Sequence, residues 1–341
     1  MEKLVTIVIS PRDRYSELAQ CIAQVYANTD NGLFDLIVLD LGYPAKDLRA
    51  AEHELASRSN YKIINMGHII PIEAIDNIRK QVSTKYTVFL DNDSRVLPGW
   101  LPPLIETCQT KQAAVVYPHI LERAGVDEGA AIRNHLFTTE FRVVYVAEKP
   151  YLIEHKTYRR ALVEDVPKSV TESEAFELHC VMFDTAILKT LEMPRMTIRE
   201  HLDIGLQLKS KGLKIYVDPR SQIVFDNLGT RANWSDMRYF NLRWNSAITS
   251  QSSRLFEKRW GYRFYSEESM YNWAVRRRTF LIMKWLYLPT LIANKIDRII
   301  AAARRRVHPV WDPLQDPDSL SVPLYDVLND NAPVQLDHSV V

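Results

Sequence analysis

The sequence predicts an α/β fold with a mainly parallel central sheet, and three observations indicate it. Short apolar runs alternate with stretches of helical period through the first third of the chain. These runs carry apolar residues at consecutive positions, which suits strands whose sheet is covered by helices on both faces. One run, at residues 86–90, leads directly into Asp91-Asn92-Asp93, and open sheets of this class bind ligands beyond the carboxyl ends of their strands.

The first third of the chain supplies four strands and three helices in alternation. Chain segments of this length between strands require right-handed crossovers, so we expect the four strands to be parallel. The expected strands are Leu4–Ser10, Phe34–Asp40, Tyr61–Asn65 and Tyr86–Leu90, and the expected helices are Tyr15–Tyr26, Ala45–Ser59 and Ile72–Ser83.

The elements that follow are spaced less regularly. Pro98-Gly99-Trp100-Leu101 predicts a turn into a short helix, and Gly212 predicts a glycine cap on a helix over Arg199–Lys211. Lys149-Pro150 predicts a turn between two strands. The further expected strands are Ala113–Tyr117, Phe141–Ala147, Tyr151–Glu154, Glu177–Phe183, Lys214–Val217 and Ile223–Phe225.

These patterns divide the chain into three regions. Residues 1–230 form the α/β domain, and about 120–170 within it have the character of an insertion or lid. Residues 231–307 are expected to be a helical C-terminal region. Residues 308–341 are rich in Pro and Asp, so we expect an extended or disordered tail.

The composition allows a sizeable core and excludes some classes of protein. The 341 residues are 46% hydrophobic, and 43 basic side chains face 42 acidic ones, so a net charge of +1 does not favour nucleic acid as a partner. Cys21, Cys108 and Cys180 lie far apart without metal-ligand spacing, which indicates a reducing compartment. We see no signal peptide and no run of 18 apolar residues, and therefore expect a cytoplasmic protein.

The stretch Thr279–Arg306 has two readings. It is rich in apolar and aromatic residues and is bracketed by arginines, which suits an amphipathic helix at the inner face of a membrane. A helix packed against protein has the same pattern. Lys284 and Pro289 interrupt the apolar run, so a spanning helix is not expected.

Asp91-Asn92-Asp93 is the strongest candidate for a functional site. Its two carboxylates stand two residues apart at the end of a buried strand, and carboxylate oxygens are hard ligands that suit Mg²⁺ or Mn²⁺. The alternative is an ordinary acidic turn that ends the strand. We expect metal binding because of the sequence around the triplet.

Five stretches in this order resemble a family 2 glycosyltransferase with the GT-A fold. The likeness covers roughly residues 4–226, allowing for boundaries that drift by a few positions. The stretches are Val5–Arg14, Asp35–Asp40, Ala74–Asp93, Pro98–Leu101 and Glu200–Ile215.

This resemblance implies a donor, a reaction and a metal. The donor would be a UDP- or GDP-sugar, and the sugar would pass with inversion to the hydroxyl of a glycan, a lipid-linked or a small-molecule acceptor, as a hexosyltransferase does in polysaccharide or glycoconjugate biosynthesis. Mn²⁺ or Mg²⁺ would be held by Asp91 and Asp93, with Asp226 where the family often has a histidine. The implied nucleotide-sugar-binding residues are Pro11, Asp13, Asp40, Asn77, Asp91 and Asn92.

The resemblance also places the catalytic base at the start of a helix. Many relatives read Glu-Asp-x-Asp there and use the second acid, whereas this chain has Glu200, His201 and Asp203. Glu200 is our first choice for the base that removes the acceptor proton, and His201 is the second. Asp203 would be a scaffold or acceptor-binding acid.

Several alternatives stay open. Asp40 could form a turn with Gly42, and Asp13 could cap the following helix. A protein of this fold that binds nucleotide without transferring sugar would also fit, since His201, Asp226 and Ile75 depart from the family pattern. A sugar nucleotidyltransferase ranks last, because the loop Ser10–Arg14 lacks the glycines that usually hold a triphosphate.

Overall fold

The computed structural model describes residues 3–12, 14–123, 132–146, 149–197, 199–225 and 235–264, and parts of 288–303 and 321–328. The chain forms two compact units, each described here by itself. The first, the sheet unit, contains residues 1–138, 156–195 and 200–243. The second unit contains residues 139–155, 196–199 and 244–341.

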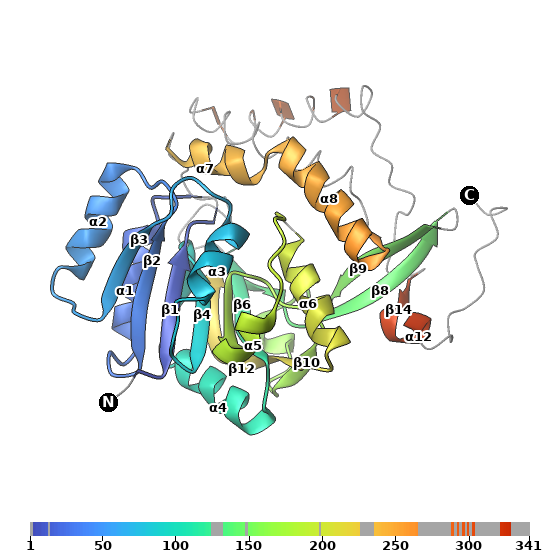
Figure 1. Ribbon diagram of the computed structural model, residues 1–341, viewed down its shortest axis with the longest axis horizontal. Coiled ribbons are helices and arrows are strands. Elements are labelled where there is room, and N and C mark those ends of the chain that lie inside the picture. Colours follow the sequence, from blue (N-terminus) through green and yellow to red (C-terminus); the bar gives the residue numbers. More distant parts are fainter. Residues whose placement is uncertain are drawn as a thin grey trace. The chain divides into compact units, whose positions relative to one another are not determined.

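The first seven elements of the sheet unit alternate as the sequence predicts (Figure 1). Strand β1 pairs in parallel with β2 and β4, and β2 pairs in parallel with β3. All residues of β1 and β4 are buried, as expected of strands covered on both faces. The elements are β1 Val5–Ser10, α1 Leu18–Asn28, β2 Phe34–Asp40, α2 Ala45–Leu55, β3 Tyr61–Asn65, α3 Pro71–Arg79 and β4 Tyr86–Asp91.

Beyond β4 the sheet becomes mixed. Its order is β10-β12-β6-β11-β4-β1-β2-β3, and β11 lies antiparallel between β4 and β6. Strand β5 pairs with β12 and β7 pairs with β6, both antiparallel. The parallel arrangement is therefore confirmed for β1 to β4 and recurs between β6 and β12. The strands are β5 Ser94–Val96, β6 Val115–Arg123, β7 Ile132–Leu136, β10 Thr171–Ser173, β11 Cys180–Asp184 and β12 Ile215–Phe225.

Strand β12 replaces the two short strands that the sequence predicts on either side of Asp218-Pro219. The register shifts between Asp218 and Gln222, so the expected break is a bulge within one strand. The Asp218 side chain accepts hydrogen bonds from Arg220 and Thr107, which hold the bulge against helix α4, Leu101–Lys111.

The remaining helices of the sheet unit have recognisable ends. Helix α5, Thr185–Thr190, is capped by the Asp184 side chain, and α6, Glu200–Ser210, is followed by Gly212 at φ +66°. This positive φ confirms the predicted glycine cap, since a residue with a Cβ is strained there. Helix α7, Asp236–Arg243, and a short 3₁₀ turn, Val163–Asp165, complete the described helices of this unit.

The second unit has a sheet of its own, in the order β13-β9-β8-β14. Val144, Tyr151 and Ile153 form a small buried cluster on β8 and β9. The predicted turn at Lys149-Pro150 is wrong, because both residues lie within β9. The elements are β8 Thr139–Val146, β9 Lys149–Lys156, α8 Ser246–Trp260, β13 Arg263–Phe264, β14 Val322–Pro323 and α12 Leu324–Leu328.

Some expectations fall on residues outside the described ranges. Asp13, Asp226 and most of the 279–306 stretch are among them, as is most of the tail from residue 308. Helices α7 and α8 lie in the predicted helical region, while β13 and β14 were not expected from the sequence. Among the described residues, no helix has the length and apolarity needed to cross a membrane.

Candidate functional site

The carboxyl ends of β1 and β4 are tied together by Asn92. Its backbone N–H donates to Ser10 O at 2.9 Å, its Oδ1 accepts from the Arg12 N–H at 3.0 Å, and its Nδ2 donates to Arg14 O at 2.5 Å. Asn92 is fully buried, so these bonds satisfy groups that water cannot reach. The residue between the two aspartates therefore braces the loop that follows β1.

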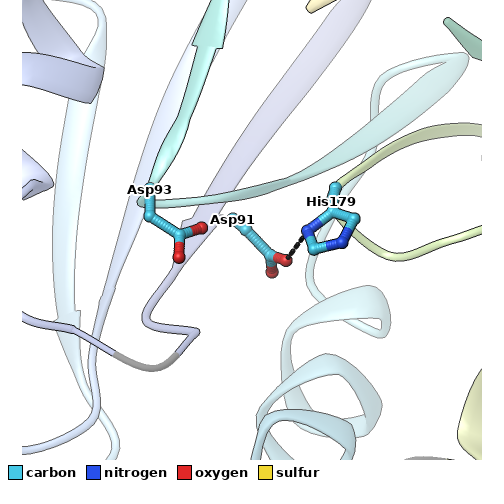
Figure 2. Close-up of side chains that lie close together, drawn as sticks. All are labelled: Asp91, Asp93 and His179. Carbon is cyan, nitrogen blue, oxygen red and sulfur yellow. Dashed lines mark ion pairs between the residues drawn. The ribbon is translucent and has the colours of Figure 1, made fainter. Parts of the chain in front are cut away.

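Asp91 and Asp93 lie beside His179, and the three side chains form a buried cluster (Figure 2). One ligand atom from each residue lies within 4.8 Å of the others. Asp91 Oδ2 is 3.1 Å from His179 Nδ1, and the Asp91 N–H donates to His179 O at 3.0 Å. The antiparallel pairing of β4 and β11 makes this approach possible, because the register that pairs Leu90 with Cys180 sets Asp91 opposite His179.

The donor set suits a small divalent cation. Carboxylates are preferred by Mg²⁺ and Mn²⁺, and an imidazole nitrogen is accepted by Mn²⁺ and other transition metals. The pKa of His179 lies well below its ordinary value, first because the ring is buried and then because of the charges of Arg12 and His135. A neutral ring has a lone pair for a metal, so Asp91, Asp93 and His179 fit such an ion.

Two arginines from the loop after β1 face the same carboxylates. Arg12 Nε is 3.3 Å from Asp91 Oδ2, and Arg14 Nη2 is 3.8 Å from Asp93 Oδ2. The Arg14 side chain is fully buried, and Arg12 is 13% exposed. Arg14 Nη1 also lies 3.9 Å from Glu17 Oε1. The site therefore holds paired charges of both signs, as buried ions require.

Behind His179 lies a second group of charged residues. Glu177, two residues earlier, is buried and pairs with Lys156 at 2.5 Å. Burial alone would raise the pKa of Glu177, but the Lys156 ammonium and the nearby histidines outweigh it and hold the pKa well below its ordinary value. One oxygen of Glu177 lies within 4.8 Å of a His201 ring nitrogen.

Aromatic contacts fix the orientation of the His179 ring. The Phe225 ring lies 3.9 Å from it, between centroids, and His135 contacts it edge-on at 5.4 Å. His135 in turn pairs with Glu122 at 3.0 Å. Phe225 is the last residue of β12 and immediately precedes Asp226 in the sequence, so β12 ends beside the cluster.

The two candidates for the base, Glu200 and His201, lie with Asp203 in the first turn of α6, and all three are buried. The positive end of the helix dipole stabilises the negative charges of Glu200 and Asp203. Asp203 Oδ2 accepts from Gln207 Nε2 at 2.6 Å. Gln207 in turn donates to the Glu192 carbonyl and accepts from the Glu192 N–H, so these bonds link Asp203 to the segment before α6. Glu200 Oε2 is buried and has no hydrogen-bond partner among the described residues.

The other predicted nucleotide-binding residues have different surroundings. Asp40 accepts from the N–H groups of Gly42 and Tyr43 and from Asn65 Nδ2, so the turn alternative is present in the structure. Pro11 is buried at the end of β1. Asn77 is exposed near the end of α3, and a helix that follows a parallel strand ends away from the carboxyl edge of the sheet.

Sequence reasoning missed His179, Glu177, Arg12 and Arg14. Glu177 and His179 lie within the predicted strand Glu177–Phe183, and this spacing is a signal that could have found them, because residues two apart in a strand share a face. An expectation of parallel strands gave no reason to place that strand against β4. The two arginines flank Asp13 in the loop that had been assigned to the nucleotide pocket.

A solved structure shares the fold of this chain. A solved structure described as "Crystal structure of GalNAc-T7 with UDP, GalNAc and Mn2+" aligns with a TM-score of 0.50 and 13% sequence identity. The alignment covers 83% of this chain and 57% of that chain, so this chain spans little more than half of it. The likeness confirms the expected glycosyltransferase GT-A fold and nothing about the substrate. In all, 351 solved chains match. One fold can carry many unrelated functions, so the fold alone does not identify the activity.

A family model matches part of the sequence. Residues 6–166 match the model described as "Glycosyl transferase family 2", and the family expected from the five stretches is confirmed over that range. The matched range contains β1 to β9 and both aspartates, while His179 and α6 lie beyond it. No curated protein sequence matches the chain.

Proposed function

We propose that this protein is a metal-dependent glycosyltransferase that moves a sugar from a nucleotide-diphosphate donor to an acceptor hydroxyl. The observation that carries the proposal is the buried cluster of Asp91, Asp93 and His179 at the carboxyl edge of a family 2 sheet. Most strand-end turns in a globular protein expose their acidic side chains, whereas both carboxylates here are 4% exposed.

The metal would be Mn²⁺ or Mg²⁺, held by Asp93, Asp91 and His179. Bound there, it would act as a Lewis acid on the diphosphate leaving group. Asp226 remains a proposed further ligand, supported by the packing of its neighbour Phe225 on the His179 ring.

The nucleotide end of the donor would lie against the loop after β1. Pro11 and Asp13 would line its pocket, and Asp40 would face base or ribose while it keeps its turn with Gly42. Asn92 supports this arrangement as a brace, since its amide is already bonded to the loop. Asn77 has the weakest support, because it is exposed near the far end of α3.

Transfer with inversion requires a base on the acceptor side, and Glu200 is the proposed base. Its buried Oε2 has no hydrogen-bond partner among the described residues, so it has room to accept a proton from an acceptor hydroxyl. His201 stays the second candidate, with the Glu177 carboxylate close to its ring. The acceptor would be a glycan, a lipid-linked or a small molecule, and the transferred sugar a hexose.

A thermal-shift screen tests the proposal. UDP, GDP and their sugars would be added with and without MnCl₂, because a ligand that binds the native state raises the unfolding temperature by mass action. We expect either UDP or GDP to raise the unfolding temperature only when the metal is present. A coupled assay should then detect release of that nucleotide from its nucleotide sugar. A protein that binds neither metal nor nucleotide would contradict the proposal.

A second candidate is a nucleotide-binding protein of the same fold without transfer chemistry. His201 stands where the resemblance implies the carboxylate that acts as the base, and the Asp203 carboxylate is hydrogen-bonded to Gln207. The variant Glu200→Gln separates the enzyme from the binding protein. An enzyme should lose turnover while its donor affinity is unchanged, whereas a binding protein should show no catalytic change.

A further inference from the structure

Each proposed metal-binding carboxylate already faces a cation from one short loop. Arg12 Nε lies 3.3 Å from Asp91 Oδ2, and Arg14 Nη2 lies 3.8 Å from Asp93 Oδ2. Both arginines are largely buried, so these charges interact in a medium that screens them less than water does. A divalent cation that binds Asp91 and Asp93 has to share its ligands with two guanidinium groups or displace them.

We propose that Arg12 and Arg14 exchange partners when the site is loaded. They neutralise Asp91 and Asp93 in the empty site, and they become the cations that bind the diphosphate of the donor once a metal has taken the carboxylates. The inference rests on the proposed function and names two residues that would bind the diphosphate.

Charge balance supports this exchange. Two carboxylates and two arginines sum to zero, so the empty group of four side chains is neutral. A divalent ion brings the group to a charge of about +2, which matches the two negative charges that a nucleotide-sugar diphosphate carries near neutral pH. Without the arginines, the metal and its two aspartates would be neutral and would attract the diphosphate only weakly.

The backbone of the loop supports the exchange as well. Asn92 accepts from the Arg12 N–H and donates to the Arg14 carbonyl, so the backbone on both sides of residue 13 is fixed to the residue between the two aspartates. The guanidinium groups can then change partners by side-chain rotation while their backbone stays in place. Guanidinium groups also match phosphate oxygens well, through paired N–H donors.

The exchange predicts opposite effects on the two ligands. Arg12→Gln removes a cation that repels the metal, so Mn²⁺ alone should bind more tightly, by about tenfold. The same change removes a partner of the diphosphate, so UDP in the presence of saturating Mn²⁺ should bind about tenfold more weakly. Both effects lie in the range typical of coupling between two bound ligands. A purely structural role would weaken both.

Isothermal titration of the full chain tests the inference, with MnCl₂ alone and then with UDP at saturating MnCl₂. Arg12→Lys keeps the charge and should keep the Mn²⁺ affinity near that of the wild type. Arg58→Gln is the matched control, because it removes an arginine that contacts the Tyr26 ring and should change neither affinity. Arg14→Lys provides a second variant, since it keeps the charge of the fully buried position while losing the guanidinium.

The outcomes separate the two proposals. If Arg12→Gln binds Mn²⁺ more tightly and UDP more weakly than the wild type does, the exchange is supported. If Arg14→Lys keeps the Mn²⁺ affinity and binds UDP more weakly, the exchange extends to Arg14. If Arg12→Gln weakens both ligands, or changes neither, the exchange is wrong and the proposed function survives. If the wild type binds neither Mn²⁺ nor UDP, both the proposed function and the exchange are overturned.

Discussion

Asp91 and His179 approach each other twice, once through their side chains and once through their backbones. Asp91 Oδ2 lies 3.1 Å from His179 Nδ1, and the Asp91 N–H donates to the His179 carbonyl at 3.0 Å. The backbone bond continues the antiparallel ladder of β4 and β11, so the two side chains are held by the sheet itself. A metal that used both would meet ligands already in place, which lowers the conformational entropy lost on binding.

His179→Ala should weaken Mn²⁺ binding about tenfold to a hundredfold while leaving the fold intact. Removing the ring deletes one ligand and leaves the two carboxylates, and the packing of Phe225 on it is a smaller loss. Titration with MnCl₂, followed by the paramagnetic signal of free Mn²⁺, measures the change. His53→Gln is the control, because His53 is exposed in the last turn of α2 and lies outside the proposed ligand set. Equal loss in both variants would contradict the assignment of His179.

Asp93→Ala should abolish metal-dependent release of nucleotide diphosphate, with a fall of about a hundredfold or more. The reason is that the proposed metal loses its main carboxylate and Arg14 loses one of the carboxylates that it faces. The release is followed in a coupled assay with and without Mn²⁺. Asp47→Asn, in the first turn of α2, removes a carboxylate far along the chain and should retain the wild-type rate. Turnover in Asp93→Ala equal to that of the wild type would exclude Asp93 as a ligand.

The parts of the fold with local signals were predictable from the sequence. Strands β2 and β3 match their predicted bounds, and β1 and β4 differ by one residue at one end, because runs of consecutive apolar residues and flanking turns specify a buried strand locally. The predicted ends of α2 and α3 were several residues too late. Helix ends depend on caps and fraying rather than on the periodic pattern.

The part of the site that the sequence did not predict depends on pairing between segments that are far apart in the chain. His179 reaches Asp91 only because β11 inserts antiparallel between β4 and β6, and no local pattern specifies which strand a run will pair with. The same holds for the register slip that merges the two predicted strands into β12. Asp40 was left open between a turn and a ligand role, and the structure shows the turn.

Glu200→Gln should lower the rate of transfer by about a hundredfold to ten-thousandfold and leave the affinity for UDP unchanged. The amide keeps the size of the side chain but cannot remove the proton of the acceptor hydroxyl, as a carboxylate does. The rate comes from a coupled assay and the affinity from titration in the presence of Mn²⁺. His201→Gln is the comparison: if it loses the rate and Glu200→Gln keeps it, the base is His201.

The three cysteines should resist alkylation in the native protein at pH 8. All are buried, and burial raises the pKa of each thiol, to about 12 for Cys108, while the thiolate is the reactive form. Iodoacetamide treatment followed by intact-mass analysis should show no added mass before unfolding in urea and three additions after it. Labelling of the native chain within minutes would show that at least one thiol is more accessible than the structure indicates.

The ion pair of Glu177 and Lys156 should make stability depend on pH. The pKa of Glu177 is held well below its ordinary value of 4.5 in the folded protein. A carboxyl group with a lowered folded pKa contributes stability above pH 4.5 and loses it as the pH falls through the folded pKa. Glu177→Gln should therefore be less stable than the wild type at pH 7, by about 2–3 kcal/mol, since it removes the buried carboxylate that pairs with Lys156.

Urea unfolding at a series of pH values from 7 to 3 measures this difference. The gap between wild type and Glu177→Gln should be constant down to about pH 4.5 and should then shrink, because the wild type is protonated at the same carboxyl group in acid. Glu172→Gln is the matched control: its pair with Lys214 is 2.6 Å long, but the side chains are 50% and 54% exposed, and such pairs contribute little. A gap for Glu177→Gln that is as small as this control, or that does not change with pH, would show that the buried pair does not stabilise the fold.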